Sequence, residues 1–219
     1  MTEVLDAPRP DTSDMLAVHR VFREALSQAP ALVGSVEDGA VDRAAVVGTY
    51  FDNVLNFLHV HHEGEDELVW PPLLERAAHQ SELVERIAAQ HGDVVEMIAR
   101  AEAALTAWTA APHAATGDAL TSALTALRTE LVTHLDEEEV HVLPLAAEHL
   151  TVQEWGSLPA HGMSHFGGDK LWLILGLLRT NMSQQQRDDM LAHMPPPAVE
   201  FWTNVGEGLY TRFMSELGI

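Results

Sequence analysis

Two segments of the chain repeat one arrangement of histidine, glutamate and proline. The first copy is His61, Glu65 and Pro71, which reads His-x3-Glu-x5-Pro, and a shift of 73 positions lays His134 and Glu138 on the same pattern. Residues four apart lie one turn apart on the same side of a helix, so both members of each pair can point at one ion. Imidazole nitrogen and carboxylate oxygen are ligands that suit iron or manganese.

Two further histidines stand alone on other segments. A shift of 72 positions lays His19 on His91, so the chain reads as two pairs of helices. Each pair contributes one histidine from its first helix and a His-x3-Glu from its second. We therefore predict that six side chains from four helices converge on a pair of metal ions, which the two carboxylates can bridge. The predicted ligands are His19, His61, Glu65, His91, His134 and Glu138.

The predicted ligands stand where apolar residues are expected. The segment that carries His61 places Val47, Phe51, Val54 and Leu58 at alternating spacings of four and three, which is typical of the buried seam of a bundle helix. His61 and Glu65 continue this seam. A buried histidine or carboxylate without a partner is costly. Bound metal would remove that cost.

The apolar seams predict an all-α protein, an antiparallel up-down four-helix bundle with an additional C-terminal helical extension packed on it. Breaks at Pro30, Gly39, Pro71-Pro72, Pro112 and Gly117 separate the helices. We predict helices over residues 14–29, 41–69, 81–110 and from Gly117 to 148, with a loop over 30–39. The expected divisions are a mobile tail (1–12), the bundle (13–150) and the extension (151–219), in which Thr151-x-x-Glu154 predicts a capping box.

Composition excludes several classes of protein. The formal net charge of −21 would repel phosphate backbones and anionic lipid, so we expect no nucleic-acid partner and no membrane partner. There is no cysteine, which excludes disulfides and thiolate ligands. The first residues have no basic and apolar signal-peptide pattern, and the longest apolar run, residues 171–178, is too short to span a bilayer. We therefore expect a cytoplasmic protein.

The segments HHEGEDELVWPPL (from His61) and HLDEEEVHVLPL (from His134) resemble the two signature repeats of the hemerythrin-like, or HHE cation-binding, family. The resemblance covers about residues 14–150. It implies an oxygen-reactive centre of two iron ions with bridging carboxylates, which can also be oxo- or hydroxo-bridged, and manganese is the alternative metal. By motif position, the resemblance implies the same six ligands.

Two positions depart from the oxygen-carrying members that the chain resembles. Those proteins have a further histidine one turn before the third-helix ligand, where this chain has Ile87. They have an aspartate five residues after the fourth-helix histidine, where this chain has Glu139, next to the better-phased Glu138. The absent histidine predicts an open or water-filled coordination position, which favours redox chemistry or substrate access over reversible oxygen carriage.

Other histidines keep alternative interpretations. His59, His62 and Glu63 lie off the seam, so we expect them to be solvated or to lie behind the ligands. His141 either hydrogen-bonds a ligand carboxylate or merely packs. The pair His161 and His165 is expected on a surface helix; alternatively, one of the two caps the cavity and replaces the absent histidine.

Three functions follow from this pattern. The first is a di-iron protein that reacts with dioxygen, peroxide or nitric oxide, for which peroxide breakdown is a reasonable activity. The second is an oxidase or oxygenase whose small organic substrate binds between the bundle and the extension. The third is a binding module that senses oxygen or iron. The sequence leaves the substrate, the choice between iron and manganese, and the oligomeric state open.

Overall fold

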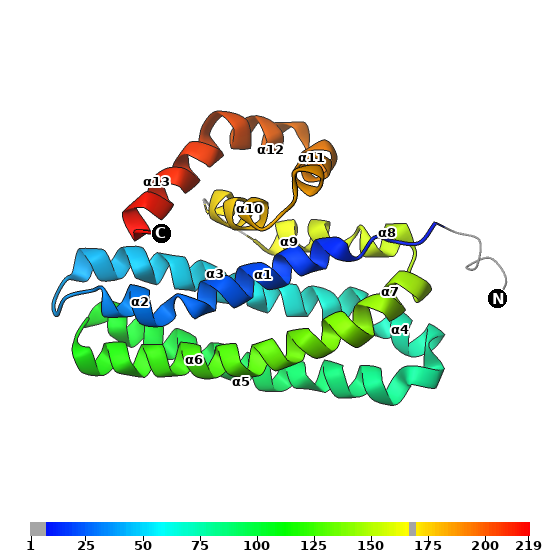
Figure 1. The fold of residues 1–219 in the computed structure, drawn as a ribbon, viewed down its shortest axis with the longest axis horizontal. Helices are drawn as coiled ribbons and strands as arrows, with labels where there is room; N and C mark the ends of the chain where they lie inside the picture. Colours follow the sequence, from blue (N-terminus) through cyan, green and yellow to red (C-terminus); the bar gives the residue numbers. More distant parts are fainter. Residues whose placement is uncertain (1–7, 167–169) are drawn as a thin grey trace.

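The computed structural model describes residues 8–166 and 170–219, and four long helices form its bundle (Figure 1). These helices are α1 (Ser13–Ser27), α3 (Val41–Leu68), α5 (Ser81–Ala110) and α6 (Ala114–Glu137). The predicted bundle with additional C-terminal helices is confirmed. The predicted tail falls partly on residues 1–7, which lie outside the described residues.

The connections between these helices are themselves largely helical. The predicted loop over residues 30–39 was wrong for its first part, because α2 occupies Ala29–Gly34. Pro30 lies in the first turn of α2, where its missing N–H is not needed. After α3, the chain forms α4 (Trp70–Arg76) and the short 3-10 helix η2 (Ala78–Gln80) before α5 begins.

The repeated prolines interrupt both helices that carry a His-x3-Glu pair. Ahead of Pro71, α3 ends at Leu68 and α4 begins two residues later. Ahead of Pro144, α6 passes into the π-helix η3 (Glu138–Val142) and then α7 (Leu143–His149). Proline lacks an N–H and collides with the carbonyl one turn earlier, so a regular α-helix cannot run through it. The wider π turn, often found at functional sites, begins at Glu138 itself.

The apolar core of the bundle is divided into two clusters. The larger cluster includes Phe22, Leu58, Val94 and Leu131, and the smaller cluster includes Met15, Trp70, Ile87 and Val142. On each of the four helical paths, the predicted ligand residues stand between members of the two clusters. The bundle therefore holds a buried polar layer between two apolar ones.

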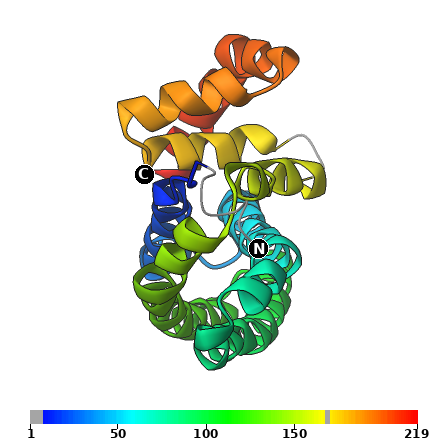
Figure 2. The ribbon, with the colours of Figure 1, turned by 90° about the vertical axis from the view of Figure 1, so that its right-hand side faces the viewer.

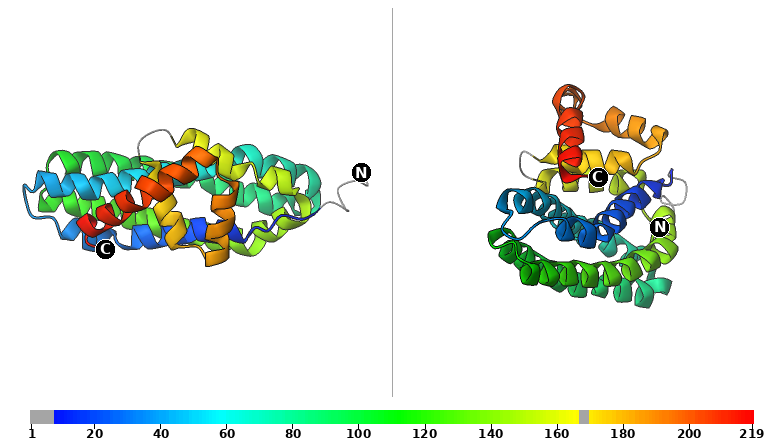
Figure 3. Two further views of the ribbon diagram at one scale, coloured as in Figure 1. Left: turned by 90° about the horizontal axis from the view of Figure 1, so that it is seen from above. Right: turned by 60° about the vertical axis from the view of Figure 1, so that its left-hand side comes forward.

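The C-terminal extension is a string of shorter helices. They are α8 (Val152–Trp155), α9 (Leu158–His165), α10 (Leu171–Thr180), α11 (Gln184–His193), α12 (Pro196–Phe201), the π-helix η4 (Trp202–Gly206) and α13 (Glu207–Leu217). They stack on one side of the bundle, where α9 contacts α3 and α10 contacts both α1 and α3 (Figures 2 and 3). The predicted capping box at Thr151 and Glu154 is present.

Polar contacts fasten the extension to the bundle near its beginning and its end. Arg76 of α4 forms two hydrogen bonds with the Glu154 carboxylate of α8. Arg43 of α3 donates to the backbone carbonyls of Glu216 and Leu217 at the end of α13. Within residues 8–166 and 170–219, no helix has both the length and the apolarity needed to cross a membrane.

Candidate metal centre

All six predicted ligands project into the polar layer of the bundle. His19 comes from α1, His91 from α5 and His134 from α6, and each side chain is buried. The α3 pair, His61 and Glu65, is also buried, with side-chain exposures of 5% and 1%. Glu138, at the first position of η3, completes the group with 2% exposure.

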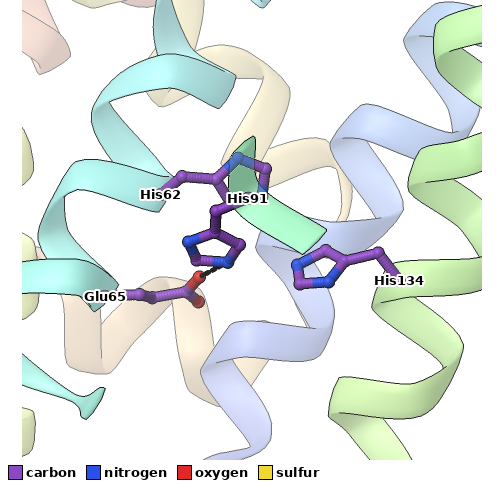
Figure 4. A group of neighbouring side chains, drawn as sticks. All are labelled: His62, Glu65, His91 and His134. Atoms are coloured by element: carbon purple, nitrogen blue, oxygen red, sulfur yellow. Dashed lines mark ion pairs between the residues drawn. The ribbon is translucent and has the colours of Figure 1, made fainter. Parts of the chain in front are cut away.

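The inner atoms of these side chains lie close together. Glu65 lies between two histidines. Its Oε1 is 3.4 Å from the Nε2 of His61. Its Oε2 is 3.5 Å from the Nε2 of His91, and Figure 4 marks this pair with a dashed line. Glu138 has a similar position, with its Oε2 3.4 Å from the Nε2 of His19 and 3.8 Å from the Nε2 of His134. Each carboxylate thus faces histidines from two helices.

The outer nitrogens of three histidines are bound to acceptors outside this layer. The Nδ1 of His19 donates to Glu139 at 2.9 Å, and the Nδ1 of His91 donates to Asp66 at 2.8 Å.

The Nδ1 of His134 donates to the amide oxygen of Gln90 at 3.0 Å. An acceptor at Nδ1 fixes the proton on that nitrogen and leaves Nε2 with its lone pair pointing inward. Carboxylates and amides in this position are the usual outer partners of metal-binding histidines.

The inward-facing atoms have no hydrogen-bond partner among the described residues. They are the Nε2 atoms of His19, His61, His91 and His134, both carboxylate oxygens of Glu65, and the Oε2 of Glu138. With Nδ1 protonated, the Nε2 atoms of His19, His91 and His134 are acceptors, and so is an ionised carboxylate. Acceptors that face one another in a buried layer leave their polar groups unmatched, which is costly. A cation at the centre would satisfy all of them.

The electrostatics of the layer argue against ordinary ion pairs. Burial, together with the neighbouring histidines, lowers the pKa of His134 to about 3 and that of His61 well below its usual value. Burial and the adjacent Glu138 raise the pKa of Glu65 well above its usual value. His61 and His134 are therefore neutral at pH 7, and their approach to the carboxylates does not pair opposite charges.

Two groups of four side chains could each hold one ion. The first is His62, Glu65, His91 and His134, and the second is His19, His61, Glu65 and Glu138. Within each group, the ligand atoms lie within 4.8 Å of one another, and Glu65 belongs to both. Imidazole and carboxylate atoms bound about 2.1 Å from one metal lie about 3 to 4 Å apart, so the measured separations suit coordination after small shifts.

His62 belongs to the first group, although its position in the sequence lies off the apolar seam. It is only 1% exposed, which contradicts the solvated alternative but not the alternative in which it lies behind the ligands. Its ring stacks on that of His91, with centroids 4.2 Å apart (Figure 4). The sequence held a signal, because Leu55 and Leu58 precede His62 by seven and four residues and so extend the apolar stripe of α3 to the side of His62.

The residues next to the two His-x3-Glu pairs differ in exposure. His59 and Glu63 are exposed, with side-chain exposures of 44% and 45%, in agreement with the expectation. His141 is also exposed, and it forms no hydrogen bond with a predicted ligand among the described residues. Glu138 lies inside the cluster. Glu139 lies outside it, where it accepts hydrogen bonds from His19 and Arg23.

The tail histidines differ from each other. His165 is exposed, but the His161 side chain is 8% exposed, so its expected place on the surface was wrong. The His161 ring packs over the backbone at Gly64, and its Nδ1 lies 3.5 Å from the Glu67 carboxylate. Neither tail histidine belongs to the two groups of possible ligands.

A cavity of about 590 Å³ lies between the bundle and the extension. Its lining includes Val21 of α1, Tyr50 of α3, Leu177 of α10 and Tyr210 of α13. Tyr50 precedes His61 by eleven residues, which is about 16 Å along a helix. Most of the cavity is therefore displaced along the bundle from the His/Glu cluster.

Comparison with known families agrees with this geometry. A family model described as the hemerythrin HHE cation-binding domain matches residues 11–146, which is well over half of the chain and includes all six predicted ligands. Neither the curated proteins nor the solved structures contain a significant match. The buried layer of His and Glu side chains lies within the matched residues, and the chain belongs to the hemerythrin HHE cation-binding family.

Proposed function

We propose that this protein is a non-haem di-iron protein that reacts with dioxygen, peroxide or nitric oxide. The observation that carries the proposal is the buried layer of unpartnered acceptors, in which two overlapping groups share Glu65. Two groups favour two ions, and nitrogen with carboxylate donors suits iron, with manganese as the alternative. The proposed ligands are His19, His61, Glu65, His91, His134 and Glu138.

Bound iron would supply the change of oxidation state and the affinity for small oxygen- or nitrogen-containing ligands. The chain's own residues orient the donors and control access. Asp66, Gln90 and Glu139 fix the direction of three histidine rings through their Nδ1 atoms. The apolar clusters on both sides of the layer exclude bulk water. The Glu65 and Glu138 carboxylates would offset the positive charge of bound metal.

Metal analysis of purified protein tests the ligand assignment. We expect about two irons per chain, since two groups of donors are available. Glu65→Ala should lose most of this iron, because Glu65 belongs to both groups. The matched control is Glu63→Ala on the same helix, whose side chain is 45% exposed and pairs only with His59 among the described residues. Full iron retention in Glu65→Ala would refute the assignment.

The reactivity requires a separate measurement. Protein reduced under anaerobic conditions should change its optical spectrum when dioxygen, hydrogen peroxide or nitric oxide is added, and Glu65→Ala should not. Repeated additions of peroxide then distinguish turnover from a single reaction. A metal-replete protein whose spectrum responds to none of the three would contradict the proposed reactivity while leaving metal binding intact.

A second candidate is an oxidase or oxygenase for a small organic molecule, and the cavity between bundle and extension favours it. This candidate predicts dioxygen consumption that depends on an added organic substrate and that falls when the cavity is filled. Such a substrate would have to reach the metals, yet Tyr50 lies about 16 Å from His61 along α3. This separation favours the first candidate.

A further inference from the structure

We propose that His62 is a seventh protein ligand of this centre, donating a ring nitrogen to the ion that His91 and His134 also face. The inference rests on the proposed function, because it requires that the layer binds metal. It adds a residue that neither the His-x3-Glu repeat nor the spacing of the single histidines indicates.

The first observation is the burial of an imidazole that has no partner. His62 is 1% exposed, and neither Nδ1 nor Nε2 has a hydrogen-bond partner among the described residues. In this respect His62 differs from His19, His91 and His134, each of which has an acceptor at Nδ1. A neutral imidazole has one donor and one acceptor, and leaving both unmet in a buried position is costly. Coordination through one nitrogen would remove part of this cost.

The second observation is the position of the ring. One ligand atom of His62 lies within 4.8 Å of ligand atoms of Glu65, His91 and His134. The ring centroid is 4.2 Å from that of His91 and 5.2 Å from that of His134 (Figure 4). Three helices thus present these four side chains to one place, with α3 contributing both Glu65 and His62.

With His62 as a ligand, the two groups would offer equal numbers of protein donors. Without His62, the group around His91 and His134 would offer two nitrogens and one shared carboxylate. With His62 it offers three nitrogens and one carboxylate, while the group around His19 and His61 offers two nitrogens and two carboxylates. Both groups then have four protein donors, but their charge differs by one carboxylate, so the two ions would be inequivalent.

His62 also accounts for the apolar residue on the facing helix. Ile87, one turn before His91 on α5, is fully buried in the smaller apolar cluster. The absent histidine at Ile87 therefore does not leave this ion short of a nitrogen, because α3 supplies one from the adjacent helix. With His62 as a ligand, the coordination position that the absent histidine predicted to be open would be filled by a protein nitrogen.

Substitution of His62 by leucine tests the inference. Leucine keeps the volume and suits the apolar stripe formed by Leu55 and Leu58. The control is His59→Leu on the same helix, whose histidine side chain is 44% exposed. After dialysis against a chelator, wild type and His59→Leu should retain two irons per chain, and His62→Leu should bind its second iron at least about tenfold more weakly. Circular dichroism checks that the helices are intact.

Nitrogen NMR of the unmodified protein gives an answer that needs no variant. In wild type labelled with ¹⁵N-histidine and loaded with Zn²⁺, which is diamagnetic, five histidines should have one metal-shifted ring nitrogen, and His62 should be among them. Four shifted histidines without His62 would overturn the inference. It would also be overturned if His62→Leu retained both irons with unchanged affinity, even with an altered optical spectrum. Failure of the proposed function is distinct, because wild type would then bind no iron.

Discussion

The orientation of the histidines in the polar layer depends on residues that never face its centre. Asp66 follows Glu65 directly in α3, and its side chain is 53% exposed, yet its Oδ1 accepts the Nδ1–H of His91 at 2.8 Å. This bond fixes the tautomer of His91 and turns its Nε2 towards Glu65. A residue of ordinary surface character therefore controls the geometry of a buried one.

Removing this outer acceptor should weaken metal binding. We expect Asp66→Ala to lower the affinity for iron by about 10- to 100-fold, because the His91 ring loses the partner that orients it. Competition with a chelator of known affinity measures the effect. Glu67→Ala is the control, since Glu67 is 65% exposed and its carboxylate faces His161 instead. Equal affinities in the two variants would contradict an orienting role for Asp66.

At the scale of elements, the close approach of α3 and α5 brings the buried layer together. Gly48 on α3 is buried where a Cβ would lie 2.5 Å from the Cγ2 of Thr109 on α5. Thr109 cannot rotate freely, because its hydroxyl donates to the backbone carbonyls of Leu105 and Thr106. The absence of a side chain at Gly48 therefore allows the two helices to approach.

A pair of glycine substitutions tests this contact. Gly48→Ala should lower the free energy of unfolding by about 1 to 3 kcal/mol, because overpacking outweighs the gain in helix propensity. Gly92→Ala on α5 should raise it by about 0.5 to 1 kcal/mol, since nothing lies within 4 Å of the added Cβ. Urea denaturation of both variants measures the difference. Similar effects of the same sign would show that Gly48 does not limit the packing.

The π-helix η3 gives the second His-x3-Glu helix a different path from the first. In α3 the chain breaks after Glu65 and restarts as α4, whereas in α6 it continues through a wider turn that begins at Glu138. Both paths avoid the clash between the proline ring and the carbonyl one turn earlier, because proline follows the glutamate at the same distance in both helices. The repeat in the sequence thus has two structural outcomes.

At the scale of the whole molecule, the extension contributes residues such as Leu173 and Leu177 to the larger apolar cluster of the bundle, and directed polar contacts add to this packing. Arg76 donates to both oxygens of Glu154, at 2.8 Å and 2.6 Å, and also to the backbone carbonyl of His149. Glu154 accepts from the backbone and hydroxyl of Thr151 as well. This cluster lies where the chain leaves α7 and enters the extension.

The stabilising effect of Glu154 should depend on pH in a defined direction. The hydrogen bonds from Arg76 lower the pKa of Glu154 to about 2, from a usual value of about 4.5. A depressed carboxyl pKa contributes stability that is complete above about pH 4.5 and is lost as the pH falls towards 2. Because Glu154 is one-third exposed, we expect Glu154→Gln to cost only about 1 kcal/mol at pH 7.

Thermal unfolding at pH 7 and at pH 3 measures this contribution. The difference between wild type and Glu154→Gln should be smaller at pH 3, because the Glu154 carboxyl is then largely protonated in the unfolded chain and part of the stability that comes from its lowered pKa in the folded state is lost. The control is Glu96→Gln, because Glu96 pairs with Arg100 on the exposed surface of α5 with 71% side-chain exposure. A Glu154 effect that did not change with pH would contradict a role for its charge.

Much of the fold and the placement of six side chains follow from the sequence alone. Helix periodicity is a local property, so the spacing of His61 and Glu65 already places both on one face of one helix. The apolar seam then indicates that this face is buried. The same reasoning applies to His134 and Glu138, and the prolines that end both helices are equally local signals.

The tertiary structure decided which neighbouring positions also face the centre. His62 is rotated by about 100° from His61 around the helix, and only the approach of α5 on that side makes its position interior. The choice of Glu138 over Glu139 for the cluster, and the burial of the His161 side chain of α9 against α3, depend likewise on which helix packs against which face. Local periodicity fixes the angles between side chains on one helix, whereas the width of the buried arc is set by the neighbours, which are distant in the sequence.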